Sequence, residues 1–134
     1  MIGKLDDYLR FNEVALSLRS QRQEVLASNI ANADTPNYKA RDIDFSAALR
    51  SALGNGPAQL AATAPKHLKG GPNGAGAAAG AALLYRTPAQ GAIDGNTVDM
   101  DIERNQFADN AIRYEVGITM INAQIKGMLA AIQG

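Results

Sequence analysis

The most regular pattern of hydrophobic positions lies in residues 101–133. Apolar side chains recur there at alternating intervals of four and three residues, the repeat of a left-handed coiled coil. These seam positions are Phe107, Ala111, Tyr114, Ile118, Ile121, Ile125, Met128 and Ile132. A core helix of a small bundle has the same spacing. The pattern continues to within two residues of the C-terminus, where an ordinary domain usually frays, and this favours a coiled-coil helix.

Residues 4–32 contain no proline or glycine and are rich in helix-forming side chains. Their apolar seam is less complete, because Asn12, Arg19 and Gln23 interrupt it. Its apolar members are Leu5, Leu9, Leu16, Leu26 and Ile30. We therefore predict a long N-terminal helix that pairs with the C-terminal helix, either antiparallel or staggered.

The middle of the chain has a different composition. Tyr38 to Phe45 alternates charged and apolar residues, which predicts an extended arm, and Asp44 is placed to cap a short helix ending before Gly54. Residues 54–92 hold four prolines and eight glycines in thirty-nine residues, a low-complexity composition typical of a flexible insertion.

These patterns predict one mainly α structural unit in which long terminal helices pair as a coiled coil. An extended, β-hairpin-like arm and a flexible Gly/Ala/Pro-rich middle complete it. Its segments are an N-terminal helix (1–33), a joint with arm and short helix (34–53), an insertion (54–92), and an acidic lead-in with the C-terminal helix (93–134).

Charge and composition exclude several classes of function. Thirteen basic and thirteen acidic residues balance, which gives no electrostatic reason to expect nucleic acid as a partner. The absence of cysteine excludes disulfides and thiol chemistry. The N-terminus lacks the apolar core of a secretory signal, and the longest uncharged run, residues 70–85, is too short to span a bilayer, so we expect no membrane insertion.

Candidate chemistry is sparse. His67 is the only histidine and has only lysines nearby, so we expect no catalytic or metal-binding role for it. The acidic segment Asp94 to Glu103 resembles a calcium loop only loosely, because its spacing fails the EF-hand pattern. We expect one of its aspartates to cap the C-terminal helix instead. The sequence predicts no catalytic residues, no metal site and no cofactor, and therefore no enzyme.

The segment SNIANADTPNY has the properties of a helix terminus. Asn29, Asn32 and Asp34 can bond to the local backbone, and Thr35-Pro36 disfavours further helix. Asn37 is suited to a left-handed turn.

The longer stretch RQEVLASNIANADTPNYKARDIDF closely resembles the signature of bacterial flagellar axial proteins, the rod and hook subunits. The matching signature residues are Asn29, Ala31, Asn32, Thr35, Pro36 and Tyr38. The later DGNTVDMDIERNQFADNAIRYE and the short length are similar to those of proximal rod subunits.

This resemblance implies a structural subunit that polymerises through its terminal helices into the drive shaft and export channel of the flagellum. The signature would then be an assembly joint. The implied partners are other copies of the chain, neighbouring rod proteins such as FlgC, the junction protein FliE at the MS ring, and the flagellar type III export apparatus. The implied location is the periplasmic rod of the basal body, reached without a cleaved signal. The alternatives are a small helical export chaperone or binding protein, and a sister proximal rod subunit.

Overall fold

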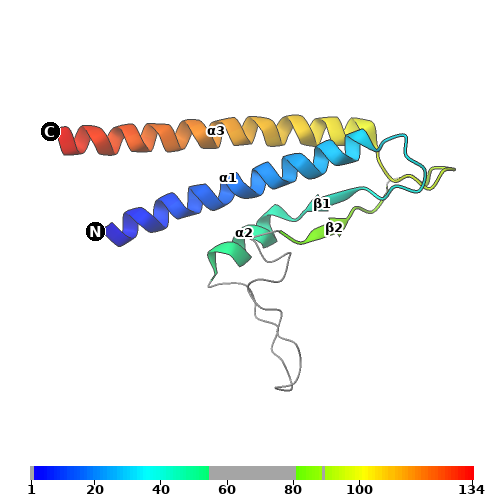
Figure 1. The fold of residues 1–134 in the computed structure, drawn as a ribbon, viewed down its shortest axis with the longest axis horizontal. Helices are drawn as coiled ribbons and strands as arrows, with labels where there is room; N and C mark the ends of the chain where they lie inside the picture. Colours follow the sequence, from blue (N-terminus) through cyan, green and yellow to red (C-terminus); the bar gives the residue numbers. More distant parts are fainter. Residues whose placement is uncertain (1, 55–80, 89) are drawn as a thin grey trace, which may run out of the picture.

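The structure is a computed structural model, which describes residues 2–54, 81–88 and 90–134. Two long helices dominate it: α1, Ile2–Ala31, and α3, Met100–Gln133. They pack against each other and run antiparallel, so the two termini lie at the same end of the molecule (Figure 1). The prediction of a mainly α fold with paired terminal helices is confirmed.

A smaller layer lies on the other side of α1. It consists of strand β1, Arg41–Ile43, helix α2, Phe45–Leu53, and strand β2, Leu83–Tyr85. The strands pair antiparallel, with Arg41 opposite Tyr85 and Ile43 opposite Leu83. Helix α1 is thus enclosed between α3 and this layer (Figure 1).

Helix α2 begins and ends where its sequence predicts. The Asp44 carboxylate accepts a hydrogen bond from the Ala47 amide at 3.0 Å, and the Gly54 amide donates to the Arg50 carbonyl at 2.8 Å. The Arg19 guanidinium of α1 lies 4.3 Å from the centre of the Phe45 ring. This cation–π contact attaches α2 to the middle of α1.

The boundaries of the predicted insertion need correction. Residues 55–80 and 89, and with them His67, lie outside the described residues. Within the predicted interval 54–92, however, the structure contains strand β2 and also Arg86, whose amide donates to the Ala40 carbonyl at 2.9 Å. A three-residue strand next to a Gly/Ala-rich run is too short to show a period, which is why composition concealed it.

The interior is small and unusually polar. Among the described residues, the buried apolar side chains are Leu18, Leu26, Ala40 and Ile43. The equally buried polar ones are Asn29, Asn96, Glu103 and Asn110. In that same part of the chain no helix combines the length and apolar character needed to span a membrane. An unpaired buried polar group costs stability, so the hydrogen bonds of these four side chains favour one arrangement of the helices and strands over others.

Candidate functional site

The signature segment follows directly on the end of α1. Helix α1 ends at Ala31, and a turn continues through Asn37, whose φ of 60° confirms the predicted left-handed conformation. The Thr35 hydroxyl donates to the Asn32 side chain at 3.1 Å. The helix therefore stops four residues before Thr35. Thr35-Pro36 lies beyond this end, where it disfavours continuation of the helix.

What closes the end of α1 is a side chain from far along the sequence. The Asn96 amide nitrogen donates to the carbonyls of Asn32, Ala33 and Thr35 at 3.0, 2.7 and 2.9 Å. Asn96 is buried, so its two amide hydrogens, shared among three acceptors, take the place of water at the helix terminus. Our sequence interpretation missed this role of Asn96, although the Asp-Gly-Asn run signalled a turn.

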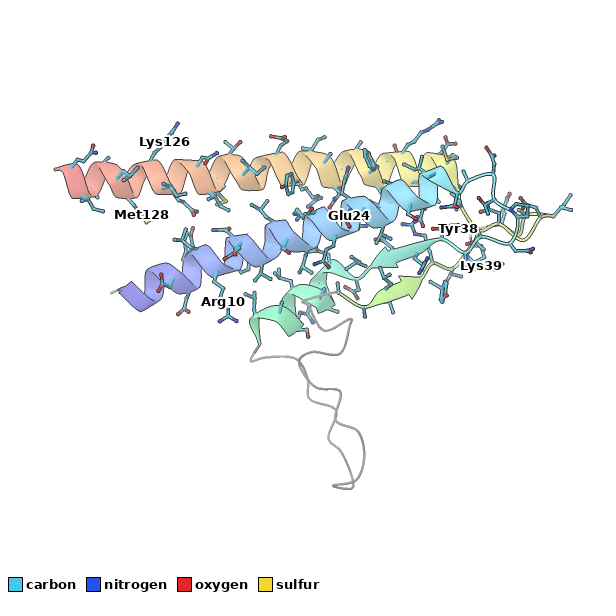
Figure 2. All side chains as sticks on the ribbon, viewed as in Figure 1. Arg10, Glu24, Tyr38, Lys39, Lys126 and Met128 are labelled. Atoms are coloured by element: carbon cyan, nitrogen blue, oxygen red, sulfur yellow. The ribbon has the colours of Figure 1, made fainter. Side chains whose placement is uncertain are left out.

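The loop around Asn96 also pairs with the arm. The Asn37 amide donates to the Asp94 carbonyl at 2.9 Å, and the Thr97 amide donates to the Tyr38 carbonyl at 3.0 Å. The Lys39 ammonium donates to the Gly95 carbonyl at 2.6 Å. Figure 2 shows Tyr38 and Lys39 at this end of the molecule, beside the loop. Residues 29–40 and 94–99 form one unit, which we call the joint.

Glycine is required at position 95. Its φ is 75°, and a Cβ there would lie 2.6 Å from the Asn37 side-chain oxygen. The two left-handed residues of the joint, Asn37 and Gly95, thus lie against each other, and neither segment can change shape alone.

The acidic segment provides the start of α3. The Asp99 side chain accepts hydrogen bonds from the amides of Asp101 and Ile102, and Asp101 and Glu103 occupy the first turn. The predicted capping role of one aspartate is confirmed. Among the described residues, no group of three or more histidine, cysteine or acidic side chains is placed to hold a metal ion.

Asn29 is the buried centre of the signature. Its amide nitrogen donates to the Arg41 carbonyl at 2.6 Å and to Glu103 at 3.1 Å. Its oxygen accepts from the Arg41 amide at 3.1 Å and from the Tyr38 hydroxyl at 3.3 Å. One side chain thus joins α1, the arm and α3.

An ion cluster continues from Glu103. Arg86 binds both Glu103 and Asp42, and Arg22 binds Asp42 through two nitrogens at 2.9 and 3.0 Å. Burial alone would raise the pKa of the Asp42 carboxyl, but the hydrogen bonds from Arg22, Arg86 and the Ile43 amide outweigh it and lower that pKa. The hydrogen bond to Asp42 likewise raises the pKa of Arg22. The cluster connects all the elements around the joint except α2.

The predicted seam of α3 divides into two parts. Phe107, Ala111, Tyr114, Ile118, Ile121 and Met128 are partly buried, whereas Ile125 and Ile132 are 41 % and 82 % exposed. The helices diverge toward the termini (Figure 1), and Ile132, in the last turn of α3, is left uncovered. In Figure 2, Met128 lies on the side of α1 and Lys126 points away from it.

Polar side chains share this contact. Asn110 donates to the Arg19 carbonyl at 2.9 Å and to Gln23 at 2.7 Å, and Gln124 bonds to Asn12 at 3.2 Å. Together with Glu103 they are spaced by multiples of seven residues, which places them on one face of α3. Two polar interruptions of the α1 seam, Asn12 and Gln23, therefore meet polar side chains of α3, whereas the Arg19 side chain lies over the Phe45 ring. We predicted the interruptions but not their partners.

Comparisons with known proteins agree with this geometry. A family model described as flagella basal body rod protein matches residues 9–39, which include the end of α1 and all six signature residues. The flagellar basal body rod protein FlgB of Salmonella typhimurium (strain LT2) is 49 % identical over 139 residues, covering 100 % of this chain and 99 % of its own.

Two further relatives give the same result. FlgB of Proteus mirabilis (strain HI4320) is 49 % identical over 99 % of this chain and 98 % of its own, and FlgB of Cereibacter sphaeroides is 46 % identical over 96 % and 95 %. Identity at this level over nearly the full length assigns the family, and the chain therefore belongs to the FlgB family of flagellar basal body rod proteins.

Proposed function

We propose that this chain is a structural subunit of the proximal rod of the flagellar basal body and polymerises through its terminal helices. The rod it builds is the drive shaft and export channel that motility requires. Rod proteins that match it over nearly its full length support a structural, non-catalytic role. They favour neither a chaperone nor a sister rod subunit, because the relatives are FlgB proteins.

The observation that carries the polymerisation step is the uncovered end of the seam. Ile132 continues the row that packs against α1, yet it is 82 % exposed. An apolar seam left open in the single chain supports completion by helices of neighbouring molecules. The partners we propose are further copies of the chain, other rod proteins such as FlgC, the junction protein FliE, and the type III export apparatus. The site of assembly is the periplasmic part of the basal body, reached without a cleaved signal.

The joint has two roles in this proposal. Asn29, Asn32 and Tyr38 hold the bend inside the chain through the bonds described above. Ala31, Thr35 and Pro36 are exposed, so they are available to contact neighbouring subunits.

The function is tested in cells that lack the gene for this chain. Reintroducing it should restore swimming, and the protein should be found in purified basal bodies by immunoblot. Its absence from basal bodies of swimming cells would refute the proposal.

The exposed part of the joint is tested by Pro36→Ala. We expect unchanged helical content in the monomer, because Asn96 already binds the carbonyls at the end of α1 and Asn37 has left the helical conformation. Flagella should nevertheless become fewer. Pro88→Ala, also exposed but outside the joint, is the matched control and should assemble normally. Equal flagellation of the two variants would remove Pro36 from the assembly contact.

A further inference from the structure

Helix α3 has a second apolar surface on the side turned away from α1. The row Ile112, Val116 and Met120 is 65 %, 60 % and 52 % exposed. With the smaller neighbours Ala111, Thr119 and Ala123, and Glu115 at its edge, this row lines a shallow groove. We call it the outer groove. Large aliphatic side chains gathered in this way mark a contact surface.

The exposed end of the seam is a separate surface. Ile125 and Ile132 belong to the seam, and Leu129 lies beside it on the turn between them; all three are exposed. At about 100° per residue the three side chains lie on one side of α3. We call these three residues the terminal stripe. It lies on a different face of α3 from the outer groove and one to three turns nearer the C-terminus.

We propose that the terminal stripe of one copy packs into the outer groove of a second copy, with the two α3 helices parallel and offset by about eleven residues. This rests on the proposed function, in which copies of the chain polymerise. Because groove and stripe lie on different faces of one helix, the contact is head-to-tail. Each copy then offers a free groove to the next, and the series extends without closing.

The spacing of the two surfaces fits this offset. A shift of about eleven residues places Ile125 between Ile112 and Val116, and Leu129 between Val116 and Met120. Ile132 then lies between Met120 and Ala123. Each side chain of the stripe would then enter a space between side chains of the facing helix, which is the usual knobs-into-holes packing of two helices. At 1.5 Å per residue the copies would be displaced by about 16 Å along the axis.

Charge supports the same register. After Glu115 the sequence contains one charged residue, Lys126, and the two positions differ by the proposed offset. Both side chains are exposed, and neither forms a salt bridge within the residues the structure describes.

The direction of packing follows from the same two charges. At about 100° per residue, Lys126 lies about a quarter-turn to one side of the terminal stripe. Viewed along the same axis direction, Glu115 lies about a quarter-turn to the other side of the outer groove. When the stripe faces the groove, the Lys126 and Glu115 side chains lie on the same side of the contact if the helices are parallel, and on opposite sides if they are antiparallel.

Cysteine cross-linking tests the contact directly, because the natural chain has no cysteine. Basal bodies are purified from cells whose only copy carries Val116→Cys together with Leu129→Cys, and are then oxidised. We expect a ladder of dimers, trimers and larger species. Each single variant should remain monomeric.

The matched control pairs Leu129→Cys with Asn105→Cys, an exposed position on the groove side of α3 but about 16 Å before Val116. This variant should give no ladder. A ladder from the control pair, a dimer from Val116→Cys alone, or no cross-link in basal bodies that contain the protein would each overturn the inference.

Charge reversal supplies an independent test. Glu115→Lys and Lys126→Glu should each reduce the fraction of flagellated cells, and the double variant should restore it. A double variant with the summed defect of the two singles would exclude this ion pair. The proposed function fails separately, by absence of the natural chain from basal bodies, so the two failures are distinguishable.

Discussion

The Asn96 side chain forms four hydrogen bonds within the joint, three to carbonyls at the end of α1 and one from the Val98 amide. Replacing it with alanine leaves the carbonyls of Asn32, Ala33 and Thr35 without their buried donor. We expect Asn96→Ala to lower the free energy of unfolding by about 1–3 kcal/mol, the cost of removing a buried donor from these carbonyls. The Asn32 and Thr35 carbonyls retain the amides of Thr35 and Tyr38 as donors. Urea unfolding of the purified protein measures this. Asn122→Ala, at an exposed position on α3, is the control and should change stability little.

Asp42 makes stability depend on pH. Its pKa is lower in the folded chain than its ordinary value of 3.8, because Arg22 and Arg86 stabilise the charged form. The carboxylate therefore contributes stability that is fully present above 3.8 and is lost as the pH falls through the lower folded pKa.

We expect Asp42→Asn to be less stable than the natural chain at neutral pH and to lose less stability on acidification. Thermal unfolding across a pH series tests this, with Asp109→Asn as the control. Asp109 is also paired with an arginine but is exposed, so its effect should be small. Parallel pH curves for Asp42→Asn and the natural chain would contradict the expected linkage.

At the scale of elements, the two parts of the α3 seam should respond differently to the same change. Ile121 is partly buried against α1, and Ile121→Asp should destabilise the isolated chain by about 1–3 kcal/mol. Ile125 is exposed, so Ile125→Asp should leave the unfolding curve nearly unchanged.

Both variants should abolish or strongly reduce swimming, for different reasons. Unfolding curves of the purified chains, compared with motility assays, separate the internal contact from the contact between copies. If Ile125→Asp swims normally, the exposed end of the seam is not used in assembly.

The sequence predicted the elements better than their partners. The C-terminal helix followed from its periodicity and the N-terminal helix from the absence of proline and glycine in residues 4–32. Asp44 and Asp99 capped their helices because capping is local. The partners of Asn29, Asn110 and Gln124 could not be predicted. Their bonds between α1 and α3 join residues 74 to 112 positions apart and depend on the register of the two helices, which a period does not encode.

Strand β2 and Arg86 were missed for a related reason. Three residues beside a low-complexity run are too few to show a period. The role of Arg86 depends on its ion pairs with Asp42 and Glu103, which are distant in the sequence. The signature residues were found because their types fit a helix end. The donor that completes that end, Asn96, comes from the other side of the middle segment.

At the scale of the whole molecule, stability should be unequal along the helix pair. The joint end is held by α1, α3 and the strand layer together, whereas toward the termini α1 and α3 diverge (Figure 1). We expect amide hydrogen exchange in dilute monomer to be slowest around residues 100–118 and fastest in the last turns of α3. Strong protection through Ile132 in a verified monomer would contradict this expectation.

The two segments of the joint, residues 29–40 and 94–99, are synthesised at different times. A chain synthesised from its N-terminus presents the end of α1 some sixty residues before Asn96, and α1 precedes most of α3 by a longer interval. Until Asn96 has emerged, the carbonyls of Asn32, Ala33 and Thr35 lack its side-chain amide as a donor. Until α3 is complete, α1 lacks its long partner helix. Contacts between residues so far apart in the sequence form late, because the chain between them must first be made and its ends brought together. The joint is therefore a timing element: the bend, and every surface whose direction it sets, becomes available only after nearly the whole chain has been made.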